Sequence, residues 1–328
     1  MREEAEDIEL VAGPDDSGRR LDRLLRVLLP GSGLSAIYSA LRTGSIRVNG
    51  RNAHGDLRIA EGDRIALPPG LWAHPPRSAD RERAGGFEAL REFLVLAGHD
   101  LLFLNKPRGM LVHGRGSLEE LVRAALSLRS AASLSFSPGP LHRLDRNSSG
   151  LVVFPASSAG ARAFTAALRA RTIRKRYLAL LQDGLGGEEE WRDVLARDGA
   201  RRKSFSAPAS PSGGPDSAGR EARSRALPLV RAGGLCLAMV EIGTGLTHQI
   251  RVQASARGMP LAGDSKYGGV PFGGGYILHA LSLEFSAPLF PDIPTFVRAP
   301  LPHEAARRLA AIFGSSTVEK ALRHAAEA

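Results

Sequence analysis

Two kinds of hydrophobic periodicity follow one another along the chain. Within residues 18–68, leucines recur at helical spacing ahead of Pro30, and this pattern predicts a short amphipathic helix. A second short helix is predicted to end at Gly44. The stretch "SIRVNG" (45–50) then alternates like a strand and ends in a hairpin-type Asn-Gly pair, and "EGDRIALP" (61–68) predicts another strand. We therefore expect a small unit of two helices followed by a β-ribbon.

From about residue 89 the chain changes to a long series of apolar, β-rich runs. Residues 157–171 interrupt this series with an amphipathic helical pattern, and the tail from Glu304 has the composition of a helix. The predicted strands lie at 93–107, 150–157, 176–181, 234–245 and 278–285. This second region is predicted to form a separate, larger domain.

Composition marks the boundaries between these units. Residues 69–88 are rich in Pro, Gly and charged side chains and are expected to form a linker, whereas "SAPASPSGGPDSAG" (206–219) has the low-complexity composition of a surface loop. We expect an N-terminal tail at 1–17, a small domain at 18–75, a linker at 76–88, a large domain at 89–315 and the end of a C-terminal helix at 316–328.

Net charge is the most informative bulk property of the chain. Lys plus Arg number 44 against 34 Asp plus Glu, which gives a formal net charge of +10. Such an excess favours a polyanionic partner, above all nucleic acid. A generally basic proteome in which Arg replaces Lys would produce the same composition, and composition alone leaves these two explanations level.

Cysteine usage and hydropathy narrow the class of protein further. The single cysteine, Cys236, lies in an apolar run, which predicts a buried strand position and rules out an intrachain disulfide or a multi-cysteine zinc site. No apolar run reaches the ~18 residues of a membrane span, and the acidic N-terminus has no signal-peptide core. We expect a cytoplasmic protein that does not contact a membrane.

Polar residues crowd the stretch "PLHRLDRNSSGLVVF" (140–154) directly ahead of a predicted buried strand. Carboxylates and guanidiniums are expensive to remove from water unless they are paired. A lone Asp ahead of a turn most often caps it or forms an Asx-turn. Asp145, however, stands in the specific string His-Arg-Leu-Asp, followed after two residues by Ser-Ser-Gly.

This string resembles the signature of RluA-type pseudouridine synthases, with Ser148 in place of the usual Thr. Further stretches match the same family in the expected order, namely "LNKPRGMLVHG" (104–114), "RKRYLALL" (174–181), "GTGLTHQIRVQASARGMPLAGDSKYGG" (243–269) and "LHALSLEF" (278–285). The resemblance spans roughly residues 95–300. It implies an α+β fold with a long mixed, largely antiparallel sheet and a central cleft.

The resemblance also implies that Asp145 is the catalytic carboxylate. A pseudouridine synthase breaks the N1–C1′ bond of uridine, turns the uracil and joins C5 to C1′; a carboxylate beside C1′ can act as nucleophile or move a proton. By the same resemblance, Arg143 helps to extrude the base from the RNA stack. Tyr177 and Ile250 would pack on the two faces of the uracil. Arg251 would pair with Asp145 and keep it ionised and oriented.

Other polar residues of the matched stretches have a less specific interpretation. His142 and His248 are interpreted as structural, because the reaction needs neither a metal nor an imidazole base. Arg251 stands between Ile250 and Val252, and this alternation predicts a strand that directs the guanidinium towards a buried partner.

Residues 18–68 resemble the S-four-type RNA-binding domain through "LDRLL", "GSIRVNG" and "GDRIAL". That family usually has arginines at the start of the second helix, where this chain has "GLSA" (33–36). The candidates for RNA contact are therefore Arg42 and Arg47 in this unit, together with Lys106 and Lys175 in the larger one.

These observations indicate a monomeric RNA pseudouridine synthase that needs no cofactor or metal, because the isomerisation is redox-neutral. Ribosomal RNA of the large subunit is the expected substrate, and tRNA is the alternative. Two rival interpretations are a catalytically silent RNA-binding or ribosome-assembly protein of the same fold, and a nucleoside hydrolase or glycosidase. Joint retention of Asp145, Tyr177 and Arg251 argues against the first, and the lack of a paired carboxylate near Asp145 argues against the second.

Overall fold

The computed structural model describes most of the chain. The described residues are 7–71, 88–126, 133–134, 136–182, 184–198, 203–207 and 219–327. Nearly all of the linker expected at 76–88, and most of the loop expected at 206–219, lie outside these residues.

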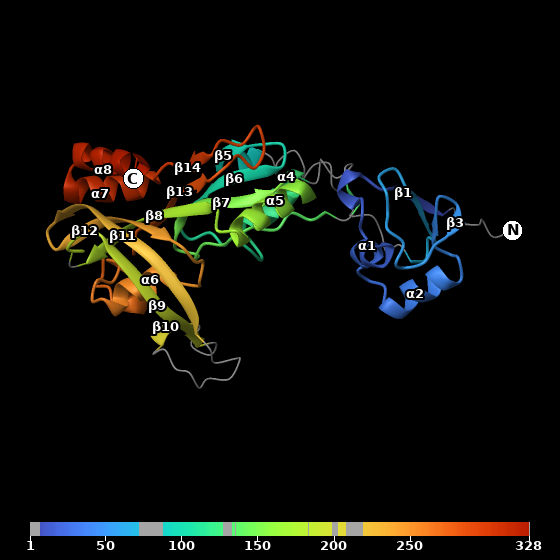
Figure 1. Cartoon of the computed structure of the whole chain (residues 1–328), viewed down its shortest axis with the longest axis horizontal. Helices are drawn as coiled ribbons and strands as arrows, with labels where there is room; N and C mark the ends of the chain where they lie inside the picture. The colour runs from blue at the N-terminus through green and yellow to red at the C-terminus, as the bar shows by residue number, and fades with distance from the viewer. Residues whose placement is uncertain are drawn as a thin grey trace.

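Helices and strands occur along the whole described chain, often in runs of one kind (Figure 1). The strands are β1 (Ile8–Val11), β2 (Arg47–Val48), β3 (Arg51–Asn52), β4 (Arg64–Leu67), β5 (Leu94–Ala97), β6 (Leu101–Lys106), β7 (Ser149–Pro155), β8 (Ile173–Gln182), β9 (Glu189–Asp198), β10 (Lys203–Ala207), β11 (Arg220–Ala232), β12 (Leu235–Ile242), β13 (Leu278–Phe285) and β14 (Phe296–Arg298). The helices are η1 (Pro14–Asp16), α1 (Leu21–Leu28), α2 (Leu34–Arg42), α4 (Leu118–Leu126), α5 (Ser158–Arg169), α6 (Gln249–Ala256), η3 (Ser265–Tyr267), α7 (His303–Phe313) and α8 (Ser315–Glu327).

The N-terminal unit has the two helices and the β-ribbon that the periodicity predicts. Asn49 and Gly50 both have positive φ angles, 52° and 73°, as the tight two-residue turn between β2 and β3 requires. The sequence predicted a tail at 1–17, and this prediction is wrong for residues 8–11. They form β1, which pairs antiparallel with β4 and completes a sheet of order β1-β4-β2-β3. A hydrophobic core of its own stabilises this unit.

Two acidic residues connect the N-terminal unit to the larger domain. The Asp15 carboxylate accepts a hydrogen bond from the backbone N–H of Ser158 (2.8 Å), at the first residue of α5. The neighbouring Asp16 carboxylate accepts from the N–H of Leu134 (2.7 Å) and from the hydroxyl of Ser133 (2.9 Å). The two units therefore share specific polar contacts, in addition to the linker between them.

A single large sheet organises the rest of the chain. Within the described residues its strand order is β10-β9-β11-β12-β8-β13-β7-β6-β5, with β14 paired to β13. Every pair is antiparallel except β13–β7, which is parallel. This confirms the α+β fold with a mixed, largely antiparallel sheet. Strands β9, β10 and β11 form an arm that projects from the body (Figure 1).

Helices cover the large sheet and divide its core into clusters. Helices α4 and α6 pack into one cluster together with β6, β7, β8 and β12, and Cys236 is buried in it as predicted. Helix α5 packs on a second cluster, and α7 and α8 pack on a third. The tail is two helices where the sequence indicated one, because Gly314, with φ 81°, breaks the helix before Ser315.

None of the helices in the described part of the chain has the length and apolar character needed to cross a membrane.

Candidate active site

Asp145 lies in the loop that leads into β7. The N–H of Ser148 donates to the Asp145 carbonyl (3.1 Å), which turns the chain towards the strand. β7 then runs parallel to β13, with Gly150 opposite Ala280. A Cβ on Gly150 would come within 2.3 Å of the Ala280 carbonyl oxygen, and its φ is +110°. Glycine is therefore required here, and it lets the loop approach β13 closely.

Arg251 of α6 links Asp145 to a second carboxylate. Its Nη1 donates to Asp145 (3.0 Å), while its Nε and Nη2 donate to the two oxygens of Asp264 (2.7 and 2.8 Å). The guanidinium also lies against the rings of Tyr267 and Tyr276, 4.9 and 4.6 Å from their centroids. Burial by itself lowers the pKa of Arg251, but the hydrogen bonds that it donates to Asp264, together with the nearby negative charges, outweigh burial and raise the pKa above its usual value. The guanidinium therefore stays charged and fixed in orientation.

This arrangement changes two details of the sequence interpretation. Arg251 lies in a helix, so the strand predicted from the Ile250–Val252 alternation is wrong. The two-point hydrogen bonding of the guanidinium goes to Asp264, and Asp145 receives the remaining donor. Asp264 was visible only as part of the matched "GDSKYGG" string, and nothing in that string shows its contact with Arg251.

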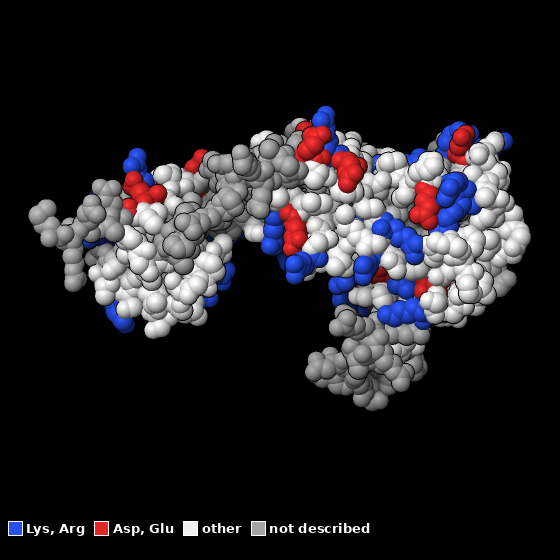
Figure 2. All heavy atoms as spheres, turned by 180° about the vertical axis from the view of Figure 1, so that it is seen from behind, with Lys and Arg blue, Asp and Glu red and all other residues white. Residues whose placement is uncertain are grey.

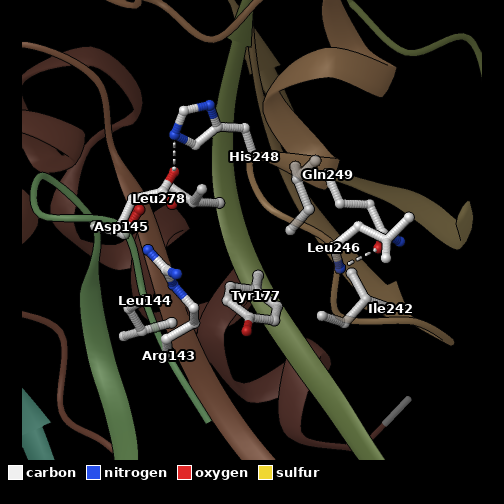
Figure 3. A pocket seen from close by; sticks show the side chains of 11 residues that line it. Arg143, Leu144, Asp145, Tyr177, Ile242, Leu246, His248, Gln249 and Leu278 are labelled. Carbon is white, nitrogen blue, oxygen red and sulfur yellow. Dashed lines mark hydrogen bonds and ion pairs between the residues drawn. The ribbon is translucent and has the colours of Figure 1, made fainter. Parts of the chain in front are cut away.

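A pocket opens beside Asp145 and encloses about 370 Å³ of space that is open to solvent. Figure 3 shows Arg143 and Asp145, from the loop ahead of β7, and Tyr177, from β8, facing this common space. Its lining residues are Arg143, Leu144, Asp145, Ser148, Tyr177, Ile242, Leu246, His248, Gln249, Ile250 and Leu278. The pocket therefore combines apolar walls with one carboxylate, which is the composition of a small-molecule or base site.

Tyr177 of β8 and Ile250 of α6 supply apolar surface to this pocket. Their exposed fractions are 8% and 3%. Burial, together with the nearby charge of Asp145, raises the pKa of Tyr177 well above its usual value. The phenol therefore stays protonated at neutral pH, and its ring is available for stacking rather than for proton abstraction.

The two histidines of the matched stretches have different environments. His142 stacks on Phe164 and accepts a hydrogen bond from the N–H of Val153 (3.2 Å), and burial lowers its pKa to about 3. His248 lines the pocket, with Nε2 3.7 Å from the Asp145 carboxylate and Nδ1 2.7 Å from the Tyr267 hydroxyl. Its φ of 59° is unusual for a residue with a side chain. Sequence reasoning did not identify His248 as part of the site.

Lys106 is not available for the RNA contact that the sequence suggested. The residue is 0% exposed, and its ammonium donates to the carbonyls of Pro107 (2.8 Å), Met110 (3.0 Å) and Arg146 (3.1 Å). Burial lowers the pKa of Lys106 to about 8, against the opposing effect of the Asp145 charge. Lys106 therefore holds the loop after β6 against the loop that carries Asp145, because the Arg146 carbonyl directly follows that residue.

Replacing Lys106 with Met is expected to lower both stability and activity. The variant leaves three backbone carbonyls without a charged donor, so the free energy of unfolding should fall by roughly 3 kcal/mol. Displacement of the Asp145 loop should lower the single-turnover rate by about 10–100-fold. Urea unfolding and rapid-quench kinetics measure the two effects, and exposed Lys320→Met is the matched control. Loss of RNA affinity with unchanged stability would instead support a phosphate contact for Lys106.

His279 anchors the first residue of β7 to β13. The residue is fully buried, its Nε2 faces the Ala299 carbonyl (3.4 Å), and its Nδ1 therefore accepts a hydrogen bond from the Ser149 hydroxyl (2.9 Å). Burial lowers the pKa of His279 to about 4, while the hydrogen bond to Ala299 opposes the shift. The imidazole is therefore neutral at physiological pH.

Stability should consequently fall as the pH drops below 6.5. Between pH 6.5 and 4 the unfolded state binds a proton at His279 that the folded state excludes, so acidification from pH 7.5 to pH 5 should remove about 2 kcal/mol through this residue. Urea unfolding at both pH values should show a correspondingly smaller loss for His279→Gln than for the wild type. His99→Gln, at an 84% exposed side chain, should keep the wild-type pH dependence. If wild type and His279→Gln lose the same stability between pH 7.5 and pH 5, His279 does not cause this pH dependence.

The remaining residues predicted for RNA contact lie at separate places. Arg143 is exposed and lines the pocket. Lys175 is half-buried on β8, burial lowers its pKa, and no carboxylate of the described chain lies within ion-pair distance of it. Arg42 and Arg47 are exposed in the N-terminal unit, and Arg47 Nε donates to the Gly44 carbonyl (3.1 Å). Arg42 and Arg47 therefore belong to the N-terminal unit, whereas Arg143 and Lys175 belong to the larger domain, where the charge of Lys175 helps to lower the pKa of His142, the neighbour of Arg143.

Among the described residues, no group of three or more His, Cys, Asp or Glu side chains is arranged to hold a metal ion.

Comparison with known proteins agrees with this fold. Residues 100–256 match the family model for RNA pseudouridylate synthase. The ribosomal large subunit pseudouridine synthase C of Salmonella typhi is 29% identical over 322 residues, covering 94% of this chain and 98% of that protein. Its Escherichia coli K12 counterpart of the same name is 29% identical over 301 residues, covering 88% and 92%.

Solved structures share the fold. Human RNA pseudouridylate synthase domain containing 4 superposes with a TM-score of 0.54 at 19% identity, over 74% of this chain and 97% of that one. Human RNA pseudouridylate synthase domain containing 1 gives 0.53 at 21% identity, over 70% and 94%. The fold is therefore that of the pseudouridine synthases.

The family match and the names of the relatives support an RNA pseudouridine synthase. The similarity to that family model lies in residues 100–256. The enzyme is an isomerase, since uridine and pseudouridine have the same atoms and differ only in the carbon or nitrogen through which the base joins the sugar.

Proposed function

We propose that this enzyme isomerises uridine in large-subunit ribosomal RNA, in the cytoplasm, with Asp145 as its catalytic carboxylate. The observation that carries the catalytic part is the Asp145 carboxylate at the edge of an apolar pocket, held from behind by the buried guanidinium of Arg251. The relatives named as large-subunit synthases align with nearly the whole chain and support the ribosomal substrate.

Each pocket residue has its own role in the proposed reaction. The N1–C1′ bond breaks with its electron pair leaving on the uracil, while Asp145 acts at the sugar as nucleophile or proton acceptor. The uracil then turns between Tyr177 and Ile250. C5 bonds to C1′ as Asp145 either leaves C1′ with its electron pair or returns its proton to the sugar, and the proton lost from C5 balances the one gained at N1. Arg143, exposed at the pocket, fills the space that the extruded nucleotide leaves in the RNA.

Cations outside the pocket bind the RNA backbone. Lys175 is half-buried without a carboxylate partner among the described residues, so a phosphate can supply the missing negative charge. Figure 2 shows Lys and Arg side chains gathered on the body next to the arm of β9, β10 and β11. The N-terminal unit acts as an S-four-type RNA-binding domain, with Arg42 and Arg47 as its contacts.

Mapping of pseudouridine in defined RNA tests the proposed function. Full-length protein is incubated with unmodified transcripts of large-subunit ribosomal RNA and, separately, with unmodified tRNA, and carbodiimide-dependent stops of reverse transcriptase locate pseudouridine. We expect a stop in ribosomal RNA that is absent with Asp145→Asn. Modification of tRNA alone would overturn the ribosomal substrate, and modification by the Asp145→Asn protein would overturn the catalytic role.

The double variant Arg42→Gln, Arg47→Gln tests the role of the N-terminal unit. Loss of two phosphate contacts should weaken RNA binding and reduce the slope of log affinity against log salt by about 1.5. Filter binding at several KCl concentrations measures both quantities. Arg323→Gln, an exposed arginine on α8, serves as the control. An unchanged affinity and slope would show that this unit does not bind RNA through these arginines.

A further inference from the structure

A second hollow lies on the other side of the loop that carries Asp145. It encloses about 330 Å³, open to solvent, and is lined by Arg108, Asn147, Ser149, Tyr276, Ile277, Leu278, Pro302, Glu304, Ala305 and Arg308. Leu278 lines both this hollow and the pocket beside Asp145. Asn147 and Ser149 follow Asp145 by two and four residues, so the two hollows are adjacent and separated by the catalytic loop.

Two arginines from distant parts of the chain meet at this hollow. A Cβ on Gly275 would lie 2.1 Å from Arg108 Nη2, and one on Gly274 would lie 2.9 Å from Arg308 Nη1. Both glycines have positive φ angles, 77° and 71°. Because neither glycine of the Gly274–Gly275 turn has a side chain, the space beside the turn is free for the guanidiniums of Arg108 and Arg308.

The Arg308 guanidinium is held in place. Its Nη2 donates to the Gly275 carbonyl (2.6 Å), and its central carbon lies 4.6 Å from the centroid of the Phe272 ring. Its side chain is only 14% exposed. Such a fixed guanidinium presents its remaining donors in a defined direction.

Charge in the hollow is unbalanced. Burial, and the like charge of Arg108, lower the pKa of Arg308, whereas Glu304 raises it. Glu304 lies 3.9 Å from Arg308 with its side chain 59% exposed, and no carboxylate in the described part of the chain lies within ion-pair distance of Arg108. Glu304 also lines the hollow, and its Oε1 lies 2.7 Å from the position of a Cβ on Gly274. The two guanidiniums thus have this one carboxylate between them, and a net positive charge is left. The first turn of α7, with Pro302 at its N-cap, adds positive potential from its unpaired N–H groups.

We infer that this hollow binds a phosphate of the substrate RNA, adjacent to the nucleotide whose base enters the pocket beside Asp145. The inference rests on the proposed function, because it needs an RNA strand that crosses the catalytic loop. An extruded nucleotide in the pocket keeps its covalent links to the neighbouring nucleotides, so its backbone passes over residues 145–149. A phosphate between Arg108 and Arg308 balances the two charges and fixes the sugar relative to Asp145.

Salt-dependent RNA binding tests the inference. A ribosomal RNA fragment in which the wild type forms pseudouridine is titrated with wild type, Arg108→Gln, Arg308→Gln and the double variant at several KCl concentrations. The double variant should bind about tenfold more weakly at 0.1 M KCl and lower the slope of log affinity against log salt by about 0.7. Glu304→Gln, which removes the competing carboxylate, should bind more tightly than the wild type.

Arg307→Gln is the matched control, because Arg307 is the exposed neighbour of Arg308 on α7. It should keep the wild-type affinity and slope, and thermal unfolding should show that all variants are folded. A wild-type affinity and slope in the folded double variant would overturn the inference. An equal loss of RNA affinity in Arg307→Gln would also overturn it, because it would indicate a general electrostatic attraction of RNA to α7.

Methylphosphonate substitution identifies the phosphate. A neutral methylphosphonate is introduced at each position flanking the target uridine. One position should weaken binding to the wild type by about tenfold and leave binding to the double variant unchanged. If every position weakens both proteins equally, the hollow does not hold a phosphate. Wild-type protein that forms no pseudouridine in any RNA would instead overturn the proposed function, and salt slopes measured with an unmodified large-subunit ribosomal RNA transcript would still report on the hollow.

Discussion

Asp145→Asn is expected to lower the single-turnover rate of pseudouridine formation by about 10⁴-fold. The amide has the shape of the carboxylate, and its oxygen can still accept the hydrogen bond from Arg251 Nη1. It has no negative charge with which to attack C1′ or to take a proton there. Rapid-quench kinetics with saturating RNA measures the rate, and RNA affinity and thermal stability should stay close to those of the wild type.

Asp56→Asn is the matched control for the loss of a carboxylate, because Asp56 is exposed in the N-terminal unit. This variant should keep the wild-type rate. Pseudouridine formation by Asp145→Asn at more than about one hundredth of the wild-type rate would show that another group carries the chemistry. The carboxylates to be tested next would then be those nearest the pocket, beginning with Asp264.

Arg251→Lys should be nearly as harmful as Arg251→Ala, with a loss of about 100-fold in the single-turnover rate. The guanidinium reaches both carboxylates at once, because Nη1 donates to Asp145 while Nε and Nη2 donate to Asp264. A lysine ammonium is a point charge on a flexible stem and does not reproduce this planar fork. Asp145 would keep a positive neighbour but lose its fixed direction towards C1′.

Stability measurements separate orientation from folding. Arg251→Ala leaves Asp264, which is 2% exposed, without its partner, so the free energy of unfolding should fall by about 3–5 kcal/mol. Arg251→Lys and Asp264→Asn keep part of the contact and should lose less stability. Arg257→Lys is the control at the C-cap of the same helix, where a single nitrogen pairs with Asp193 (3.0 Å). A wild-type rate in Arg251→Lys would show that charge alone is sufficient and that the fork does not orient Asp145.

Local elements of this protein are well predicted from local patterns. The helix at Leu21–Leu28 follows from regular leucine spacing, and the β2–β3 turn follows from the tolerance of Asn49 and Gly50 for positive φ. Helix α6 was missed for the opposite reason. Its residues from Gln249 to Ala254 are all buried, so no polar face produces a helical period.

Some contacts between residues far apart in the chain could not be predicted from the sequence. Lys106 was interpreted as a candidate for RNA contact, because nothing in "LNKP" shows that three carbonyls surround its ammonium. β1 was assigned to a tail, because a four-residue strand is too short to be distinguished from coil until β4 pairs with it. In both cases the partner groups come from other segments of the chain.

The sequence by itself determined which residues are the candidates for the chemistry and in what order they occur, because the motif around Asp145 and those around Tyr177 and Arg251 are specific strings. Only the tertiary structure decided how they are held. Asp145 and Arg251 lie 106 positions apart, and their 3.0 Å contact exists because β13 draws the Asp145 loop to the centre of the sheet while α6 packs across it. Asp264 and Lys106 acquire their roles in the same way. Their partners are fixed by packing between elements, which no local pattern records.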